Sequence, residues 1–254
     1  MRKNMYFSKH NMLFAALFFS LLAGMIFLPG KADAQILREI QITGGYSQDM
    51  GMEADKLLKR IKGPAAGAVI HLNLTDYLSV SLEGSYADLT IDQDDPVEQW
   101  NWPFWQRFYR NYVRNLVNSD PNYSVVLTPM QNMYMIPVVV AVNGFLPVND
   151  WISPFISLGG GMVFYERNLR LNEAWTKYFP EIDNYFNYEY DNHAGSKKGQ
   201  AWLARIAVGA EFHIWESFGL STDLAYTHYF LQQHDTFFPL RSDLSVRAGI
   251  VFYY

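Results

Sequence analysis

The chain of 254 residues contains no cysteine. Structural disulfides, thiol catalysis and lipid attachment through an N-terminal cysteine are therefore excluded. After residue 30 the sequence also lacks any apolar run near the ~18 residues that a membrane-spanning helix requires. Basic residues are few, 20 against 25 acidic ones, and this balance argues against a nucleic-acid partner.

The first 34 residues have the pattern of a secretory signal. Basic residues precede a hydrophobic stretch from 12 to 28, and the small-residue sequence Ala-Asp-Ala follows at 32–34. We predict that residues 1–34 are a signal peptide and that residues 35–254 form one domain; an uncleaved anchoring helix is the alternative. Cleavage would remove four basic residues and one acidic residue, leaving 16 basic against 24 acidic.

The last twelve residues alternate between apolar and polar side chains. One face would carry Leu244, Val246, Ala248, Ile250, Phe252 and Tyr254. The other face would carry Asp243, Ser245, Arg247 and Gly249. A strand with these two faces needs lipid on one side and a polar, crowded interior on the other, which a membrane β-barrel supplies.

Eight segments have strand character, and the connections between them alternate in length. The segments are 37–46, 65–74, 77–89, 131–146, 151–167, 200–214, 218–230 and 242–254. Tight turns are expected at 75–76, 147–150 and 215–217, and long loops at 47–64, 90–130, 168–199 and 231–241. This alternation predicts an all-β fold, an eight-stranded antiparallel transmembrane barrel with short periplasmic turns and long extracellular loops.

Charged side chains fall on the predicted luminal face of the strands. An eight-stranded barrel has just enough interior to be filled by side chains, so we expect these charges to neutralise one another. The expected luminal network is Glu83, Arg205, Glu211, Asp223 and Arg247. Aromatic residues gather at both ends of the strands, and we expect Tyr77, Trp151, Trp202, Trp215 and Tyr254 to lie at the membrane interfaces.

Two segments and the closing strand carry a family resemblance. The segments Ile136-Pro-Val-Val-Val-Ala-Val-Asn-Gly-Phe-Leu146 and Trp151-Ile-Ser-Pro-Phe-Ile-Ser-Leu-Gly-Gly-Gly161, with the strand that ends at Tyr254, resemble OmpA/OmpW-type eight-stranded outer-membrane barrels. The resemblance implies a location in the bacterial outer membrane and insertion by the barrel assembly machinery. It transfers no functional residue.

Two of the long loops have a distinctive composition. In the loop 90–130, Pro103 precedes arginines and aromatics at helical spacing, which predicts a short amphipathic helix. Its interaction candidates are Trp105, Arg107, Arg110 and Arg114, which could meet lipopolysaccharide phosphates and lipid, although the helix could equally be a lid over the barrel. The loop 168–199 is aromatic and acidic, and it predicts either a binding surface or strand extensions that pair above the membrane.

These features favour a structural or surface-interaction barrel that acts through its loops. A narrow channel for small or hydrophobic solutes is the alternative. An outer-membrane protease or lipid-modifying enzyme is a more remote alternative. The pairs Asp92/Asp94 and Asp191/His193 resemble a protease pattern only weakly. A lipid-modifying enzyme would need a serine two residues after His228, where the chain has Phe230. We predict no cofactor and no metal site, lipid and lipopolysaccharide as partners, and a monomer, because a closed barrel has no edge strand.

Overall fold

The computed structural model describes residues 37–50, 58–146, 148–230 and 237–254. The predicted signal peptide and its cleavage site lie outside the described residues. The strands are β1 (Leu37–Asp49), β2 (Leu58–Thr75), β3 (Leu78–Gln93), β4 (Tyr123–Phe145), β5 (Ile152–Phe179), β6 (Asn184–His193), β7 (Lys197–Trp215), β8 (Phe218–Phe230) and β9 (Ser242–Tyr253). The helical segments are α2 (Pro96–Gln99), the π-helical η1 (Trp105–Tyr109) and α3 (Arg110–Ser119). None of the helices in the described ranges is long and apolar enough to cross a membrane.

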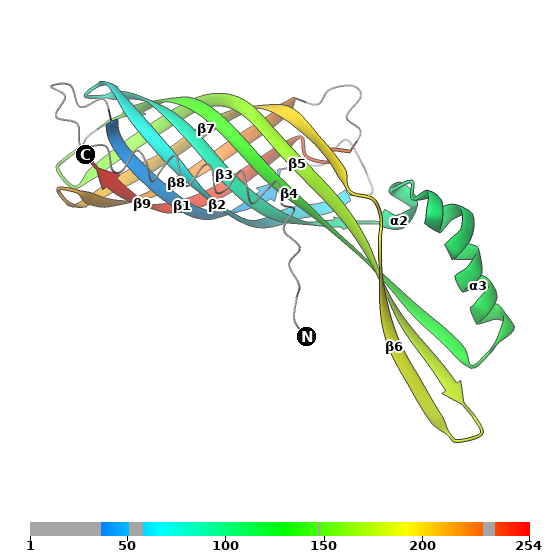
Figure 1. Ribbon diagram of the computed structural model, residues 1–254. Helices are drawn as coiled ribbons and strands as arrows, with labels where there is room; N and C mark the ends of the chain where they lie inside the picture. The colour runs from blue at the N-terminus through cyan, green and yellow to red at the C-terminus, as the bar shows by residue number, and fades with distance from the viewer. Residues whose placement is uncertain (1–36, 51–57, 147, 231–236) are drawn as a thin grey trace. The chain divides into compact units, whose positions relative to one another are not determined.

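Eight of these strands close into a ring, as the alternation of turns and loops predicts (Figure 1). Their order around the barrel is β1, β2, β3, β4, β5, β7, β8 and β9, and β9 pairs with β1 from Glu39↔Tyr253 to Asp49↔Asp243. All of the pairings are antiparallel. The tight connections β2–β3, β4–β5 and β7–β8 lie at one end, which we call the short-turn end.

Strand β3 changes polarity along its length. In the half next to the short turns, Leu78 and Leu82 point outward and Ser79, Ser81 and Glu83 are buried inside. In the other half, Asp88, Thr90 and Asp92 point outward, while Ala87, Leu89 and Ile91 are buried inside. We call these the short-turn half and the loop half. The predicted lipid-facing pattern therefore holds for the short-turn half, and its sign reverses in the loop half.

The loop half contains a hydrophobic core inside the barrel. It includes Ile61, Leu89, Met133, Met135, Val163, Tyr165, Leu203 and Tyr229 from the strands, and Phe238 and Leu240 from the connection between β8 and β9. Phe238 packs against the rings of Tyr165 and Tyr229, with ring centroids 4.8 and 5.1 Å apart. We call this group the apolar plug. Each large side chain buried in it contributes about 1.5–3 kcal/mol through removal of apolar surface from water.

Strands β4 and β5 run beyond the barrel and form a three-stranded sheet with β6 (Figure 1). β4 and β5 stay paired from Phe145↔Phe155 to Tyr123↔Lys177, and β6 pairs with the far part of β5 from Arg170↔His193 to Phe179↔Asn184. We call residues 123–130 and 168–193 the extension. Of the two possibilities for the loop 168–199, the structure has the paired strands.

One face of the extension is covered by the helical segment. Trp100, Trp102 and Trp105 pack with Val97 on Leu169 and Leu171 of β5. The opposite face carries polar pairs, such as Asn172 Nδ2 donating to Asp191 Oδ1 at 2.9 Å and Thr176 Oγ1 donating to Asn187 Oδ1 at 2.8 Å. The extension therefore has two layers, with an apolar cluster between the helical segment and the sheet and polar pairs on the opposite face of the sheet.

Candidate functional site

Four of the five predicted luminal charges meet in the short-turn half of the barrel. Glu83 on β3 accepts hydrogen bonds from Arg205 on β7 and, at 2.6 Å, from Arg247 Nη1 on β9. Arg247 Nε also donates to Asp223 Oδ1 on β8 at 2.8 Å. All four side chains are almost fully buried. The charges of the two carboxylates and the two guanidiniums cancel, as burial requires.

Glycines make room for this ion-pair cluster. A Cβ atom at Gly45 would lie 2.3 Å from the Val246 carbonyl oxygen and 3.0 Å from Arg247 Cγ. A Cβ atom at Gly209 would lie 2.7 Å from Asp223 Cβ. Both distances are shorter than a real Cβ tolerates, so the two glycines leave the space that Arg247 and Asp223 occupy.

Glu211, the fifth predicted charge, belongs to a separate cluster. It lies six residues along β7 from Arg205, a distance of about 20 Å at ~3.3 Å per residue. There Gln41 Nε2 donates both to Glu211 Oε1 at 3.2 Å and to Glu39 Oε1 at 3.0 Å. Arg38 lies 3.3 Å from Glu39 and 3.8 Å from Glu211, and His71 Nε2 lies 3.6 Å from Glu39.

Sequence reasoning missed Arg38, Glu39 and His71 as members of this second cluster. The signal for Glu39 was present, because the polar residues Glu39, Gln41, Thr43 and Ser47 alternate along β1 and are all buried inside the barrel. This alternation alone could have assigned the luminal face of β1.

An arginine covers the apolar plug at the end of the barrel opposite the short turns. Arg167 Nε donates to Gln131 Oε1 at 2.9 Å, and its Nη2 donates to Gln93 Oε1 at 2.8 Å. Its guanidinium carbon lies 5.3 Å from the ring centroid of Trp100. The neighbouring Lys197 ammonium lies 3.8 Å from the Phe237 ring and 4.7 Å from the Trp100 ring. Burial, followed by the charge of Arg167, lowers the pKa of Lys197 to about 8.

The described part of the lumen has little free space between its two layers. A cavity of about 30 Å³ lies between the ion-pair cluster and the apolar plug, lined by Arg205, Arg247, Met135 and Tyr229 among others. That volume corresponds to about one water molecule. Within the described ranges, polar and apolar side chains thus fill the barrel in series.

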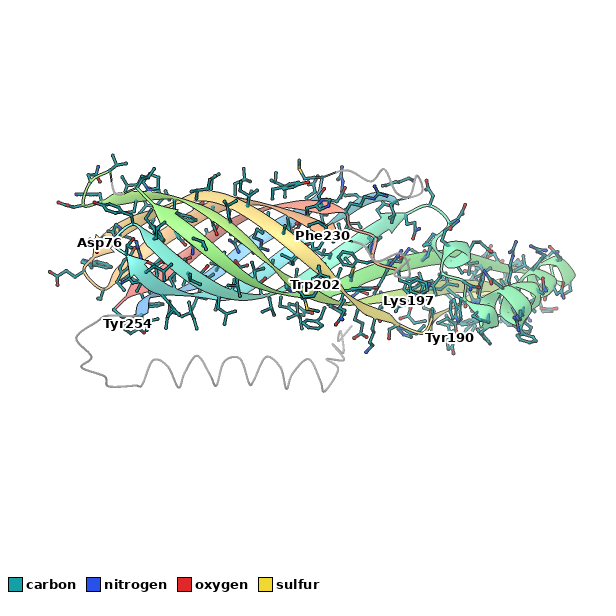
Figure 2. All side chains as sticks on the ribbon, turned by 90° about the horizontal axis from the view of Figure 1, so that it is seen from above. Asp76, Tyr190, Lys197, Trp202, Phe230 and Tyr254 are labelled. Carbon is teal, nitrogen blue, oxygen red and sulfur yellow. The ribbon has the colours of Figure 1, made fainter. Side chains whose placement is uncertain are left out.

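The five predicted interfacial aromatics all point away from the barrel interior. Tyr77, Trp151, Trp215 and Tyr254 lie at the short-turn end, and Trp202 pairs in register with Phe230 on the neighbouring strand. Figure 2 shows Trp202 and Phe230 between Asp76 and Tyr254 on one side and Lys197 and Tyr190 on the other. The 12 steps of β8 from Phe218 to Phe230 correspond to about 28 Å of barrel height at ~3.3 Å per residue and ~45° tilt, close to the apolar band of such barrels.

The helix candidates do not share one environment. Arg107, Arg110 and Arg114 are exposed, and Arg110 Nη1 donates to Glu98 Oε1 at 2.8 Å. Trp105 is only 5% exposed, because it packs beneath the helix with Trp102 and Tyr109. Trp105 is therefore part of the packing core of the extension, and the exposed aromatics of this segment are Phe104, Phe108 and Tyr112.

A buried carboxylate lies beneath the helix, in the acidic and aromatic segment 168–199. Glu173 on β5 is fully buried. Tyr109 Oη donates to its Oε2 at 3.0 Å, Trp175 Nε1 donates to the same oxygen at 2.8 Å, and Asn192 Nδ2 donates to Oε1. The alternation Leu169, Leu171, Glu173, Trp175 could have placed this carboxylate on the covered face of β5.

An open groove borders this carboxylate, between the helix and strand β6. It has a volume of about 470 Å³ and is lined by Phe104, Tyr109, Tyr112, Leu116, Trp175, Tyr188, Glu189, Tyr190 and Asn192. Trp175 stacks on Tyr188 with ring centroids 6.1 Å apart, and Tyr109 lies 5.8 Å from Tyr112. Burial and the hydrogen bond to Glu173 raise the pKa of Tyr109 to about 12, so its hydroxyl stays a donor at neutral pH. We call this the aromatic groove.

Two of the aspartates weighed for an enzymatic role make contacts with neighbouring strands. Asp94 forms an ion pair with Lys59 at 2.5 Å, and Asp191 accepts from Asn172 on the polar face of the extension. In the part of the chain that the structure describes, no group of three or more His, Cys, Asp or Glu side chains could hold a metal ion.

Comparison with known families bears on the fold and the charge pattern together. Residues 18–252 match the family described as outer membrane protein beta-barrel domain. The chain belongs to this family. Its barrel therefore spans the bacterial outer membrane. A comparison with curated proteins gives no match.

Solved structures with a similar fold are outer-membrane barrels of low sequence identity. Neisserial surface protein A (NspA) is 6% identical, with 85% of this chain and 96% of that chain covered and a TM-score of 0.46. OprG from Pseudomonas aeruginosa is 9% identical, with 85% and 96% covered and a TM-score of 0.43. Ail, the attachment invasion locus protein of Yersinia pestis, is 13% identical, with 85% and 99% covered and a TM-score of 0.37.

Proposed function

We propose that this protein is a non-enzymatic surface-interaction barrel whose lumen is closed and whose binding surface is the helix-covered extension. The observation that carries the proposal is the aromatic groove on a rigid three-stranded sheet, held by continuous strands of the barrel itself. A site on strands is more precisely positioned than one on a free loop. The groove's volume and aromatic walls are those of a binding pocket.

The filling of the lumen supports the scaffold role of the barrel. A solute would have to pass both the ion-pair cluster and the apolar plug, and the described residues leave about 30 Å³ between them. Opening such a path means separating buried charges, which costs several kcal/mol. A channel is therefore the weaker proposal for the same barrel.

Conductance of the refolded full chain in planar bilayers tests this part of the proposal. We expect no unitary conductance from the wild type, from the variant with Glu83, Arg205 and Arg247 all changed to serine, or from Phe238→Ser with Leu240→Ser. We expect none either when all five substitutions are combined, because the cluster of Glu39, Gln41 and Glu211 still crosses the lumen. Discrete conductance of the wild type would contradict the closed scaffold and favour a channel.

We further propose that lipopolysaccharide is one partner of the helical segment. Phe108 is 68% exposed, and Arg107 and Arg114 of the same helical segment are exposed too, so the segment presents a ring and two cations to its surroundings. Guanidiniums pair well with phosphates, and aromatics enter the lipid interface. Arg107→Ser with Arg114→Ser should weaken binding to lipopolysaccharide-containing vesicles, most at low salt. The matched control is Arg170→Ser, on the polar face; an equal loss there would argue for a general charge effect.

A further inference from the structure

The charge of Glu173 has no cationic partner among the described residues. Its three hydrogen-bond donors, Tyr109, Trp175 and Asn192, are all neutral groups. Two of the buried luminal carboxylates, Glu83 and Asp223, are by contrast each paired with arginine. A buried charge without a counter-ion is costly, and its field extends into the nearest open space because little solvent screens it. For Glu173 that space is the aromatic groove.

The walls of the groove add to this negative potential. The faces of aromatic rings carry the negative part of their quadrupole. Tyr109 and Tyr112 come from the helical side, and Trp175, Tyr188 and Tyr190 come from the sheet. No lysine or arginine is among the described residues that line the groove. Lys177, on the same face of the sheet, lies over the Tyr123 ring at 4.6 Å and 4.0 Å from Asp120.

The molecule already places cations against aromatic rings elsewhere. Lys197 lies against Phe237 and Trp100, and Arg38 lies 3.6 Å from the ring centroid of Phe145. These contacts use side chains of the chain itself. The groove has such rings, and its lining among the described residues contains no lysine or arginine, so a cation from outside can contact them.

Hydrogen bonding decides which kind of cation fits. Both oxygens of Glu173 already accept from protein donors, and the carboxylate is fully buried. A guanidinium or primary ammonium brings several N–H donors, and the Glu173 oxygens, already occupied, offer these donors no acceptor. A quaternary ammonium donates no hydrogen bond and needs only charge and apolar contact.

We propose that the aromatic groove binds a quaternary ammonium group, such as that of choline, between the tyrosines of the helical segment and Trp175 and Tyr188. The inference deepens the proposed surface-interaction role by naming the chemistry of the ligand. Glu173 supplies the negative potential without touching the ligand, and the rings supply the contact.

Calorimetric titration of the full refolded chain in octyl glucoside tests the proposal, since this detergent has no ammonium headgroup. The probes are choline and 3,3-dimethyl-1-butanol, which has the same shape and no charge. We expect choline to bind at least tenfold more tightly than the neutral alcohol. Equal binding of the two, or no heat from choline up to 100 mM, would overturn the proposal. N-acetyl-arginine amide binding more tightly than choline would also overturn it.

Two variants separate the charge from the walls. Glu173→Gln keeps an acceptor and removes the charge, so choline affinity should fall about tenfold while the affinity for the neutral alcohol stays the same. Tyr188→Ala removes a wall, so both affinities should fall. The control is Glu181→Gln at the exposed β5–β6 turn, which changes the net charge equally and should leave both affinities unchanged. A loss with Glu181→Gln equal to that with Glu173→Gln would refute the role of the buried carboxylate.

This result is independent of the conductance experiment. A conducting wild type that still binds choline selectively would overturn the closed scaffold and leave the ligand class standing. A closed barrel that shows no preference for choline would do the reverse.

Discussion

The two halves of the barrel differ in the polarity of their outer and inner faces. The short-turn half has apolar residues outside and ion pairs inside, whereas the loop half has the apolar plug inside and, on β3, charges outside. The first arrangement suits lipid and the second suits water. The reversal on β3 falls near Tyr86 and Tyr134, whose rings stack 6.0 Å apart. The change of sign along a strand thus marks where the membrane ends.

The largest effect should come from breaking the charge balance in the short-turn half. Glu83→Ala leaves Arg205 without a carboxylate partner and Arg247 with Asp223 alone, and we expect it to lower the free energy of unfolding by about 3–5 kcal/mol. Urea unfolding in lipid vesicles, followed by tryptophan fluorescence, measures this. Glu166→Ala removes an outward-facing partner of Lys198 and should cost at most about 1 kcal/mol. Similar costs for the two variants would contradict the buried network.

The loop half should respond to loss of volume in the apolar plug. Phe238→Ala leaves a cavity between Tyr165 and Tyr229, and we expect a loss of about 3 kcal/mol in the same unfolding experiment. Phe237 is 41% exposed, so Phe237→Ala should cost about 1 kcal/mol through its contact with Lys197. If Phe237→Ala were the more damaging change, the plug would not stabilise this half.

The position of the reversal can be tested with one substitution on each side of it. Leu82→Arg places a charge in the lipid band and should destabilise the folded barrel by about 2–4 kcal/mol, depending on depth. Thr90→Arg, eight residues along the same face of β3, should change stability by less than about 0.5 kcal/mol. Equal costs would mean that both positions face the same medium.

The smallest effect is a titration at the mouth of the loop half. The folded pKa of Lys197, about 8, is below its ordinary value of 10.5 because burial disfavours the charged form. The native state therefore releases this proton before the unfolded state does, and stability should rise as the pH increases from about 8 to 10.5. Acylation of Lys197, followed by peptide mass mapping, should show a midpoint near pH 8 when folded. A midpoint near 10.5 in the folded protein would contradict the burial.

The strands and their faces could be predicted because alternation reports the medium on each side directly. Leu78 and Leu82 against Ser79 and Glu83 is one example, and the structure has them as expected. The segment 136–142 had no readable polarity because both of its faces are apolar. Val138 and Val140 point outward, whereas Val139 and Ala141 join the plug cluster. The inward side chains of this part of β4 are therefore as apolar as its outward ones, and the sequence shows no alternation there.

Features that depend on positions far apart in the sequence could not be predicted in this way. Glu211 and Arg205 share a face of β7, but only the barrel register shows that Glu211 meets Gln41 and Arg38 instead. Trp105 lies in a segment whose arginines and aromatics resemble a surface anchor, and its burial depends on packing against the sheet β4–β5–β6. The segment of β6 left a binding loop and paired strands equally open, because nearly all of its polar and aromatic residues are exposed and show no alternation.

The extension also changes how the protein must be kept from associating with itself. A closed ring leaves no free strand edge, but among the described strands β6 pairs with β5 alone and presents a row of backbone groups on its other side. Such an edge can pair with another chain. Glu189 and Asp191 are carried on this strand and are exposed, so two β6 edges would meet with like charges close together, a repulsion that disfavours fibre growth. Solubility of the extension therefore depends on two carboxylates that the barrel itself does not need.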